Sequence, residues 1–171
     1  FLDEADSFDL RRGIANDKYD VIFTPSYEKA YYDKEGYLSR LFSAAPIDLC
    51  ISKHHPAANS EEFNVKLLQH DKIYTLNNEY APDYEELVKS ISQRYKLSSL
   101  AVTPKSNLQT VYNAMIKGEG CFLYCSSWFP AIDADIFCRY HMSNEMGGIM
   151  MVWNKTTTNP SVANLRKCIR F

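Results

Sequence analysis

The sequence predicts an α/β fold in which strands and helices alternate and a largely parallel sheet is covered by helices on both faces. Short apolar runs such as "VIF" at 21–23 and "CFLY" at 121–124 are typical of strands buried on both sides. The stretches between such runs carry apolar residues at three- and four-residue spacing, which indicates amphipathic helices. This alternation is typical of three layers, α/β/α, around a sheet.

The first elements are a short helix at residues 8–17 and a strand at 19–26. The segment 37–53 follows with two strand-like stretches, the second of which alternates apolar and other residues. The next expected elements are a strand at 71–77 and a helix that begins at Asp83. The apolar face of that helix is formed by Tyr84, Leu87, Val88, Ile91 and Tyr95.

A further strand at 99–104 leads into a helix over 106–120, which Ser106 and Gln109 would open as a capping box and Gly118 would end. Strands at 121–128, 136–142 and 147–155 follow, and Asn159 caps a last helix with Pro160 at its first position.

Residues 60 to 152 alone supply a β-α-β-α-β unit, and the flanking segments supply an incomplete second one. We therefore expect two Rossmann-like lobes joined by two crossover segments near Asn59 and Asn154. One lobe contains residues 1–58 and 155–171, apparently without a first strand, and the other contains residues 59–154.

Composition limits the function. With 46% hydrophobic and 23% charged residues the chain can bury a core, and 19 Lys and Arg against 21 Asp and Glu leave a net charge of -2. That balance argues against nucleic-acid binding by this segment, because a basic face is needed to neutralise the phosphates. The five cysteines form no CxxC pair, the start is acidic, and no apolar run approaches the ~18 residues that span a membrane. We expect a soluble, cytoplasmic chain without membrane contact.

The pair His54–His55 before Pro56 could be a metal site or a structural corner. Proline keeps His55 out of the helical region, which suits a chain leaving a strand. Zinc needs three or four ligands, and His70, His141 and the cysteines show no ligand spacing. The corner is favoured, and we expect no metal and no cofactor.

Cys125, in "YCSSW", is the best candidate nucleophile, but the sequence shows neither a base nor a positive group beside it. We expect a semi-buried thiol, no catalytic residues and no enzyme activity.

Five segments resemble one family, in its order and spacing. They are "YDVIF" at 19–23, "IDLCISKHHPAA" at 47–58, "SNLQTVYNAMIKGEGCFLYCSSW" at 106–128, "IMMVWNK" at 149–155 and "NPSVANLRKCI" at 159–169. The chain resembles the effector-binding (substrate-binding) domain of LysR-type bacterial transcription regulators, which has the type 2 periplasmic-binding-protein fold. Cys125 stands where that family often has Pro, and Ala57 where it has Leu. The family's N-terminal winged helix-turn-helix has no counterpart in this chain.

The resemblance implies a ligand-sensing regulatory domain whose two lobes bind a small-molecule effector in the cleft between them. It also implies a homodimer or tetramer formed through this domain, and DNA binding only through the N-terminal domain. The alternative is a transport-type solute-binding protein or an enzyme of the same fold, such as a prephenate dehydratase.

Ligands of open α/β sheets bind beyond the carboxyl ends of strands. The loops at those ends here are rich in hydroxyls and amides, and by resemblance they line the cleft. The expected effector-binding residues are Thr24, Ser26, Asn77, Ser106, Asn107 and Ser126. Lys105 and the helix start behind it favour a small carboxylate or other anion, while the tyrosines leave room for an aromatic effector.

Overall fold

The computed structural model describes residues 4–60, 64–77, 79, 81–97 and 102–169. Its strands form one six-stranded sheet in the order β1-β6-β2-β5-β3-β4. The strands are β1 (Val21–Pro25), β2 (Leu38–Ser52), β3 (Ile73–Leu76), β4 (Val102–Lys105), β5 (Cys121–Tyr124) and β6 (Phe137–Trp153). The α-helices are α1 (Ser7–Ala15), α2 (Lys29–Lys34), α3 (Tyr84–Arg94), α4 (Leu108–Ile116) and α5 (Pro160–Cys168). Three short 3-10 helices complete the elements, namely η1 (Ser26–Glu28), η2 (Pro56–Asn59) and η3 (Val65–Leu68).

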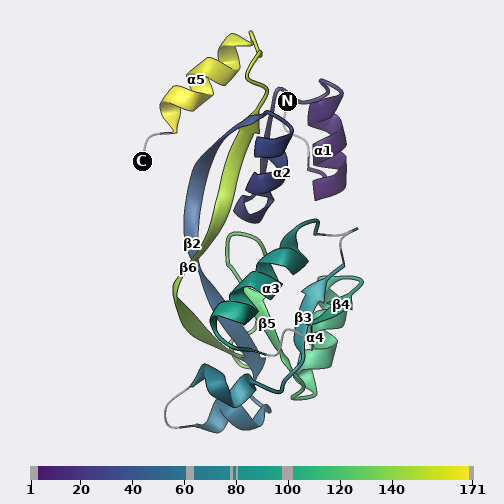
Figure 1. Cartoon of the computed structure of the whole chain (residues 1–171), viewed down its shortest axis with the longest axis vertical. Helices are drawn as coiled ribbons and strands as arrows, with labels where there is room; N and C mark the ends of the chain where they lie inside the picture. The colour runs from purple at the N-terminus through teal and green to yellow at the C-terminus, as the bar shows by residue number, and fades with distance from the viewer. Residues whose placement is uncertain (1–3, 61–63, 78, 80, 98–101, 170–171) are drawn as a thin grey trace.

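The long antiparallel strands β2 and β6 run through both ends of the molecule (Figure 1). β2 has 15 residues and β6 has 17, so each reaches about 50 Å at ~3.4 Å per residue. β1 pairs with β6 near one end of this ribbon, and β5 pairs with β2 near the other, where β3 and β4 continue the sheet in parallel. Two register shifts, after Leu41 and after Pro46, bend the ribbon between its ends.

The buried side chains divide into separate clusters at the two ends of the ribbon. At one end, which we call the terminal lobe, α1, α2 and α5 pack on β1 and the adjoining parts of β2 and β6. Because successive strand residues point to opposite faces, Met150 and Val152 of β6 pack under α1 and α2, while Met151 and Trp153 pack under α5. Helices thus cover both faces of the sheet here.

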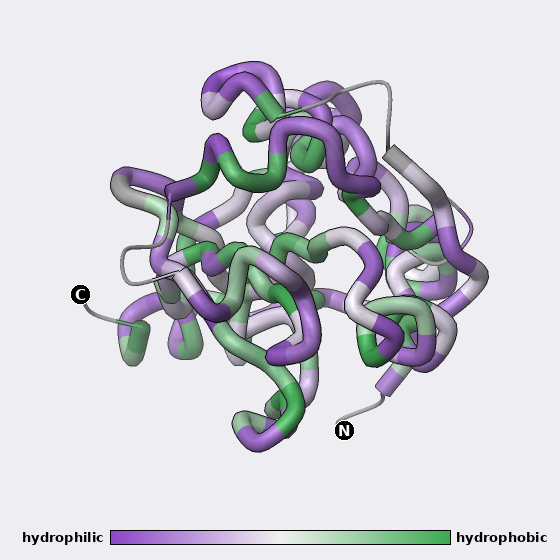
Figure 2. The backbone as a smooth tube through the Cα atoms, turned by 90° about the horizontal axis from the view of Figure 1, so that it is seen from below, coloured by the Kyte–Doolittle hydropathy of each residue, from purple (hydrophilic) through white to green (hydrophobic). Residues whose placement is uncertain are grey.

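The other end, which we call the central lobe, contains α3, α4, β3, β4, β5 and the adjoining parts of β2 and β6. Its single cluster includes Ile47, Tyr84, Val88, Val111 and Phe122. Figure 2 shows hydrophilic and hydrophobic residues alternating around the helices, as expected where one face of a helix packs on a sheet.

The α/β class is confirmed and a strand lies in each expected strand region, but the sheet is mixed. Only β3, β4 and β5 are parallel to one another, because the ribbon of β2 and β6 is antiparallel. The segments expected as two strands each, 37–53 and 136–155, are single long strands that serve both lobes. The crossover segments are therefore the middles of β2 and β6. The expected lobe limits, with residues 1–58 and 155–171 in one lobe and 59–154 in the other, stay a prediction.

The start of α4 differs from the expected one by a single residue. Asn107, and not Ser106, is the cap: its side-chain oxygen accepts from the Thr110 backbone N–H at 3.0 Å. The Thr110 hydroxyl accepts in return from the Asn107 backbone N–H. With Asn107 as the cap, Gln109 is the second helical residue and not the third, and its side-chain Nε2 donates to Asn113 Oδ1 at 3.0 Å. The Ser106–Gln109 capping box was therefore a wrong prediction.

The helix α2 and the three 3-10 helices were not predicted. Residues 99–101 of the expected strand 99–104 lie outside the described residues, and β4 accounts for the rest. None of the helices in the described part of the chain combines the length and the apolar character that crossing a bilayer requires.

Candidate functional site

The carboxyl ends of the three parallel strands lie at one edge of the central lobe. β3 lies between β5 and β4, so Asn77, Ser106 and Ser126 follow neighbouring strands. The backbone N–H of Asn77 donates to the Lys105 carbonyl oxygen at 3.0 Å, which ties the first two loops together. Three of the expected site residues are thus on adjoining loops.

The end of β1 reaches the same region from the terminal lobe. Tyr27, beside Ser26 in η1, stacks edge-on against Trp128 at 5.0 Å between ring centroids and lies 5.4 Å from the ring of Tyr84. Trp128 follows Ser126 by two residues. The hydroxyl- and amide-rich loops of both lobes therefore meet at one junction.

The expected residues differ in what they can offer a ligand. Ser106 and Ser126 are exposed, and Ser26 and Asn77 are partly buried. Thr24 is buried, and its hydroxyl donates to Glu28 Oε2 at 3.0 Å. Asn107 is occupied as the helix cap. Which of the six touch an effector stays a prediction.

The Lys105 side chain lies against the sheet. Its Nζ is 4.9 Å from the centre of the Tyr74 ring, a distance at which the ring attracts a cation. The positive end of α4 and the nearby Lys105 remain the features that would favour an anion at this edge.

Trp128 packs against both the ribbon and Tyr27 at the junction. Its indole Nε1 donates to the Gly148 carbonyl oxygen at 2.7 Å. A Cβ on Gly147 would lie 2.2 Å from the indole ring. The glycine pair in the middle of β6 therefore lets the indole lie directly on the ribbon that joins the lobes.

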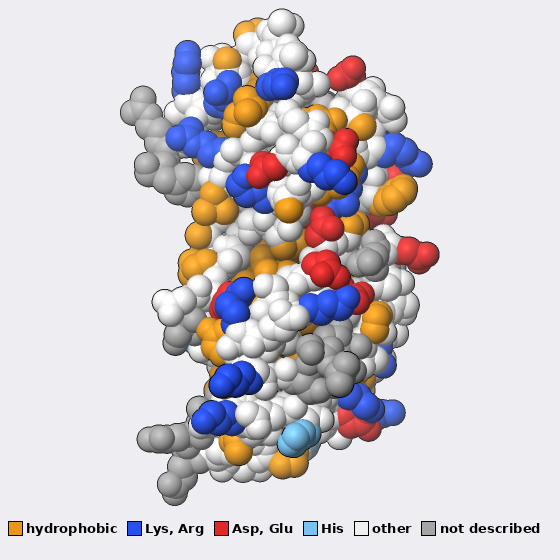
Figure 3. All heavy atoms as spheres, in the orientation of Figure 1, with side chains coloured by type: hydrophobic (Ala, Val, Ile, Leu, Met, Phe, Trp, Pro, Cys, Tyr) orange, Lys and Arg blue, Asp and Glu red, His pale blue; other side chains and the backbone are white. Residues whose placement is uncertain are grey.

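A charged cluster at the junction was not predicted from the sequence. Arg11 of α1 lies with Nη2 2.7 Å from Asp83 Oδ2, at the start of α3, and with Nε 3.5 Å from Glu28 Oε2. Figure 3 shows acidic and basic side chains gathered on one face at the level where the two halves of the molecule meet. No pattern in the sequence signals this cluster, because 72 residues separate Arg11 from Asp83.

Glu28 is the most unusual member of that cluster. Its side chain is fully buried, and its Oε1 has no hydrogen-bond partner among the residues that the structure describes. Burial raises the pKa of Glu28, while Ser7, Arg11 and Thr24 act in the opposite direction. The carboxyl group is therefore easier to protonate than an ordinary glutamate.

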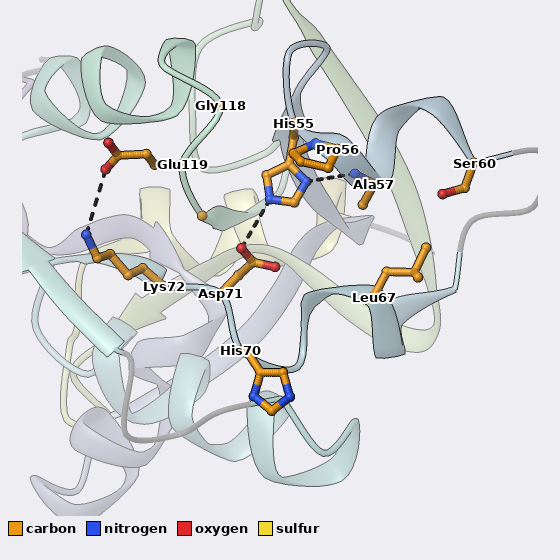
Figure 4. A pocket seen from close by; sticks show the side chains of 11 residues that line it. His55, Pro56, Ala57, Ser60, Leu67, His70, Asp71, Lys72, Gly118 and Glu119 are labelled. Atoms are coloured by element: carbon orange, nitrogen blue, oxygen red, sulfur yellow. Dashed lines mark hydrogen bonds and ion pairs between the residues drawn. The ribbon is translucent and has the colours of Figure 1, made fainter.

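The His54–His55 corner lies at the far end of the central lobe, at a cavity of about 610 Å³ (Figure 4). His55 Nδ1 accepts from the Ala57 backbone N–H at 3.1 Å, and Nε2 lies 3.2 Å from Asp71 Oδ1. Since Nδ1 is an acceptor, Nε2 carries the proton and donates to Asp71. His55 caps η2, which supports the structural corner.

Cys125, the residue after β5, is completely buried, and its Sγ lies 3.9 Å from the Ala45 carbonyl oxygen. Burial raises the pKa of the Cys125 thiol. The thiolate needed for nucleophilic attack is therefore disfavoured.

No protein-family model matches the chain, and no curated protein matches its sequence. Solved structures do match. The reduced form of OxyR superposes with a TM-score of 0.70 at 18% identity, over 99% of this chain and 78% of that one. A mutant of full-length BenM gives 0.76 at 14% identity, over 99% and 55%. The reduced regulatory domain of OxyR2 from Vibrio vulnificus gives 0.68 at 16% identity, over 96% and 76%.

These matches show the fold. The chain has the type 2 periplasmic-binding-protein-like fold found in the regulatory domains of LysR-type regulators. It spans 55% of the length of the full-length BenM structure.

Proposed function

We propose that this chain is the effector-sensing regulatory domain of a LysR-type transcription regulator. In this proposal a small molecule binds at the junction of the two lobes and biases their arrangement. A ligand can do so only through different affinities for two arrangements. The binding would then alter DNA binding or transcription by a longer protein, in the cytoplasm and without turnover of the ligand.

One observation carries the proposal most directly: polar loops from both lobes meet at the junction around Tyr27 and Trp128. The similarity to regulatory domains of OxyR and OxyR2 supports the same reading. The antiparallel ribbon of β2 and β6 supports it too, since both of its strands run from one lobe into the other.

The proposed contacts are Ser26, Asn77, Ser106 and Ser126, with Thr24 and Asn107 behind them. The exposed hydroxyls and the first-turn N–H groups of α4 favour a small carboxylate or other anion. We further propose that the domain forms a homodimer or tetramer, and that DNA contact belongs to another domain of the longer protein.

The test is a thermal-shift screen of small carboxylates and other anions, followed by calorimetric titration of each hit. A specific effector should raise the melting temperature, because it binds only the folded form. The changes Ser126→Ala and Ser106→Ala should weaken the binding of that effector. Asn113→Ala, on the exposed side of α4, serves as the matched control and should leave affinity unchanged. An effector whose affinity ignores both serines, or one that the domain chemically converts, would contradict the proposal.

A further inference from the structure

The cluster of Arg11, Glu28 and Asp83 has one positive group between two carboxylates. Arg11 lies on α1 of the terminal lobe, Glu28 lies in η1 directly after β1 of that lobe, and Asp83 precedes α3 of the central lobe. The side chains of Arg11 and Glu28 are 14% and 0% exposed, and that of Asp83 is 40% exposed. The guanidinium of Arg11 therefore contacts a carboxyl group on each side of the lobe junction. Water reaches it mainly from the side of Asp83.

The two carboxylates do not share Arg11 equally. The contact to Asp83 is 2.7 Å long and the contact to Glu28 is 3.5 Å long. The planar face of Arg11 also stacks on Tyr31, with its central carbon 3.8 Å from the ring centre. With the lobes in contact, Asp83 therefore holds the guanidinium more closely than Glu28 does.

The Glu28 carboxyl group has few other stabilising contacts. In the part of the chain that the structure describes, the Thr24 hydroxyl, at 3.0 Å, and the long Arg11 contact reach Oε2, while Ser7 also acts on the carboxyl group. Among the described residues Oε1 has no hydrogen-bond partner, and neither does the nearby buried hydroxyl of Tyr32. Among the described residues, the other ionisable groups that act on this cluster are Tyr27, Tyr31, Tyr32 and Asp83, and none of them adds a positive charge.

We propose that contact between the lobes is coupled to the uptake of one proton by Glu28, through competition between Glu28 and Asp83 for Arg11. When the lobes part, Asp83 withdraws and Arg11 is left to Glu28, which favours the ionised carboxylate. When the lobes close, Asp83 draws Arg11 away and Glu28 becomes neutral. The cluster is then electrically balanced, with one cation and one anion. Acidification therefore favours the closed arrangement.

The direction of the Glu28 pKa agrees with this coupling, since burial raises that pKa while Arg11 is in contact with Asp83. The coupling concerns the lobes themselves and holds with or without an effector. Its failure would leave the proposed effector site untouched, and the reverse is also true.

The experiment measures the distance between the lobes at a series of pH values from 8 to 5. Spin labels are placed on the exposed Cys168 of α5 and on a cysteine introduced by Gln109→Cys on α4, with the partly buried Cys138 changed by Cys138→Ser. Pulsed dipolar spectroscopy then gives the populations of the separated and closed arrangements.

Three variants separate the roles. Glu28→Gln imitates the protonated carboxyl, so its distances should be those of the closed form at every pH. Asp83→Asn removes the competitor and suits the left-handed backbone of that residue (φ 65°), so the separated population should dominate throughout. Arg12→Gln is the matched control, because Arg12 is exposed and pairs with Asp9 on its own helix. It should titrate like the parent.

The parent protein should shift its populations at least several-fold toward the closed form over this pH range. A parent whose distances do not change with pH overturns the proposal, even if no variant folds. So does a Glu28→Gln protein that titrates like the parent, or an Asp83→Asn protein with unchanged distances.

Discussion

The indole of Trp128 occupies the space that a side chain on Gly147 would need, and its Nε1 donates to the neighbouring Gly148. This contact attaches the loop after β5 to the middle of the ribbon that joins the lobes. The close contact between the Trp128 ring and Gly147 leaves no room for a side chain at position 147.

Gly147→Ala should destabilise the fold by about 1–3 kcal/mol, the usual cost of overpacking, because the new Cβ would lie 2.2 Å from the ring. Urea unfolding followed by circular dichroism measures this. In a Trp128→Ala background the same Gly147→Ala change should cost little, since the clash is gone. An equal cost in both backgrounds would show that the two residues are not coupled.

Glu28→Gln should make the stability less dependent on pH. The folded-state pKa of Glu28 is raised by burial, so its contribution to stability is fully present below the unfolded pKa of about 4.3. That contribution is lost as the pH rises through the raised folded value. Near neutral pH the variant should therefore be at least as stable as the parent.

Free energies of unfolding at pH 5, 6 and 7 measure this effect. The difference between variant and parent should grow with pH in favour of the variant, up to the raised pKa. A variant that loses stability at pH 7 would mean that the ionised Glu28 is well stabilised by Arg11 and Thr24.

Much of the fold could be predicted from the sequence, because local patterns determine it. The apolar face of α3 and the Pro160 start of α5 depend on spacing within one turn or two, and both helices lie where expected. The mixed sheet could not be predicted in this way. Residues 37–53 and 136–155 look like pairs of strands, and only the tertiary pairing of β2 with β6 makes each of them continuous.

The sequence also indicates which loops lie at the carboxyl edge of the parallel strands. Carboxyl-end loops follow from strand order, so Asn77, Ser106 and Ser126 could be named in advance. The Arg11–Asp83 contact could not, since it depends on how the two lobes meet rather than on any local spacing.

His55→Ala should destabilise the central lobe, because it removes a buried ring whose two nitrogens both have partners. A hydrogen bond to a charged group contributes about 1.5–3 kcal/mol, so we expect a loss of that size in urea unfolding. His54→Ala is the control, since His54 is exposed and such changes usually stay within about 0.5 kcal/mol. A chelator that lowers the stability of the parent, but not that of His55→Ala, would point to a bound metal instead of a corner.

The last prediction separates the two neighbours at the start of α4. Asn107 caps the helix, so Asn107→Ala should lower the free energy of unfolding by about 1 kcal/mol. Ser106 is exposed and does not cap the helix, so Ser106→Ala should change stability by no more than about 0.5 kcal/mol. If an anionic effector binds at this helix start, Ser106→Ala should instead weaken binding, by about 1.5–3 kcal/mol for a lost bond to a charged group. Urea unfolding and calorimetric titration of the two variants give both quantities. If an effector binds Ser106→Ala as tightly as the parent, the result would indicate that the anion binds away from α4, near the loops of Ser26 and Ser126.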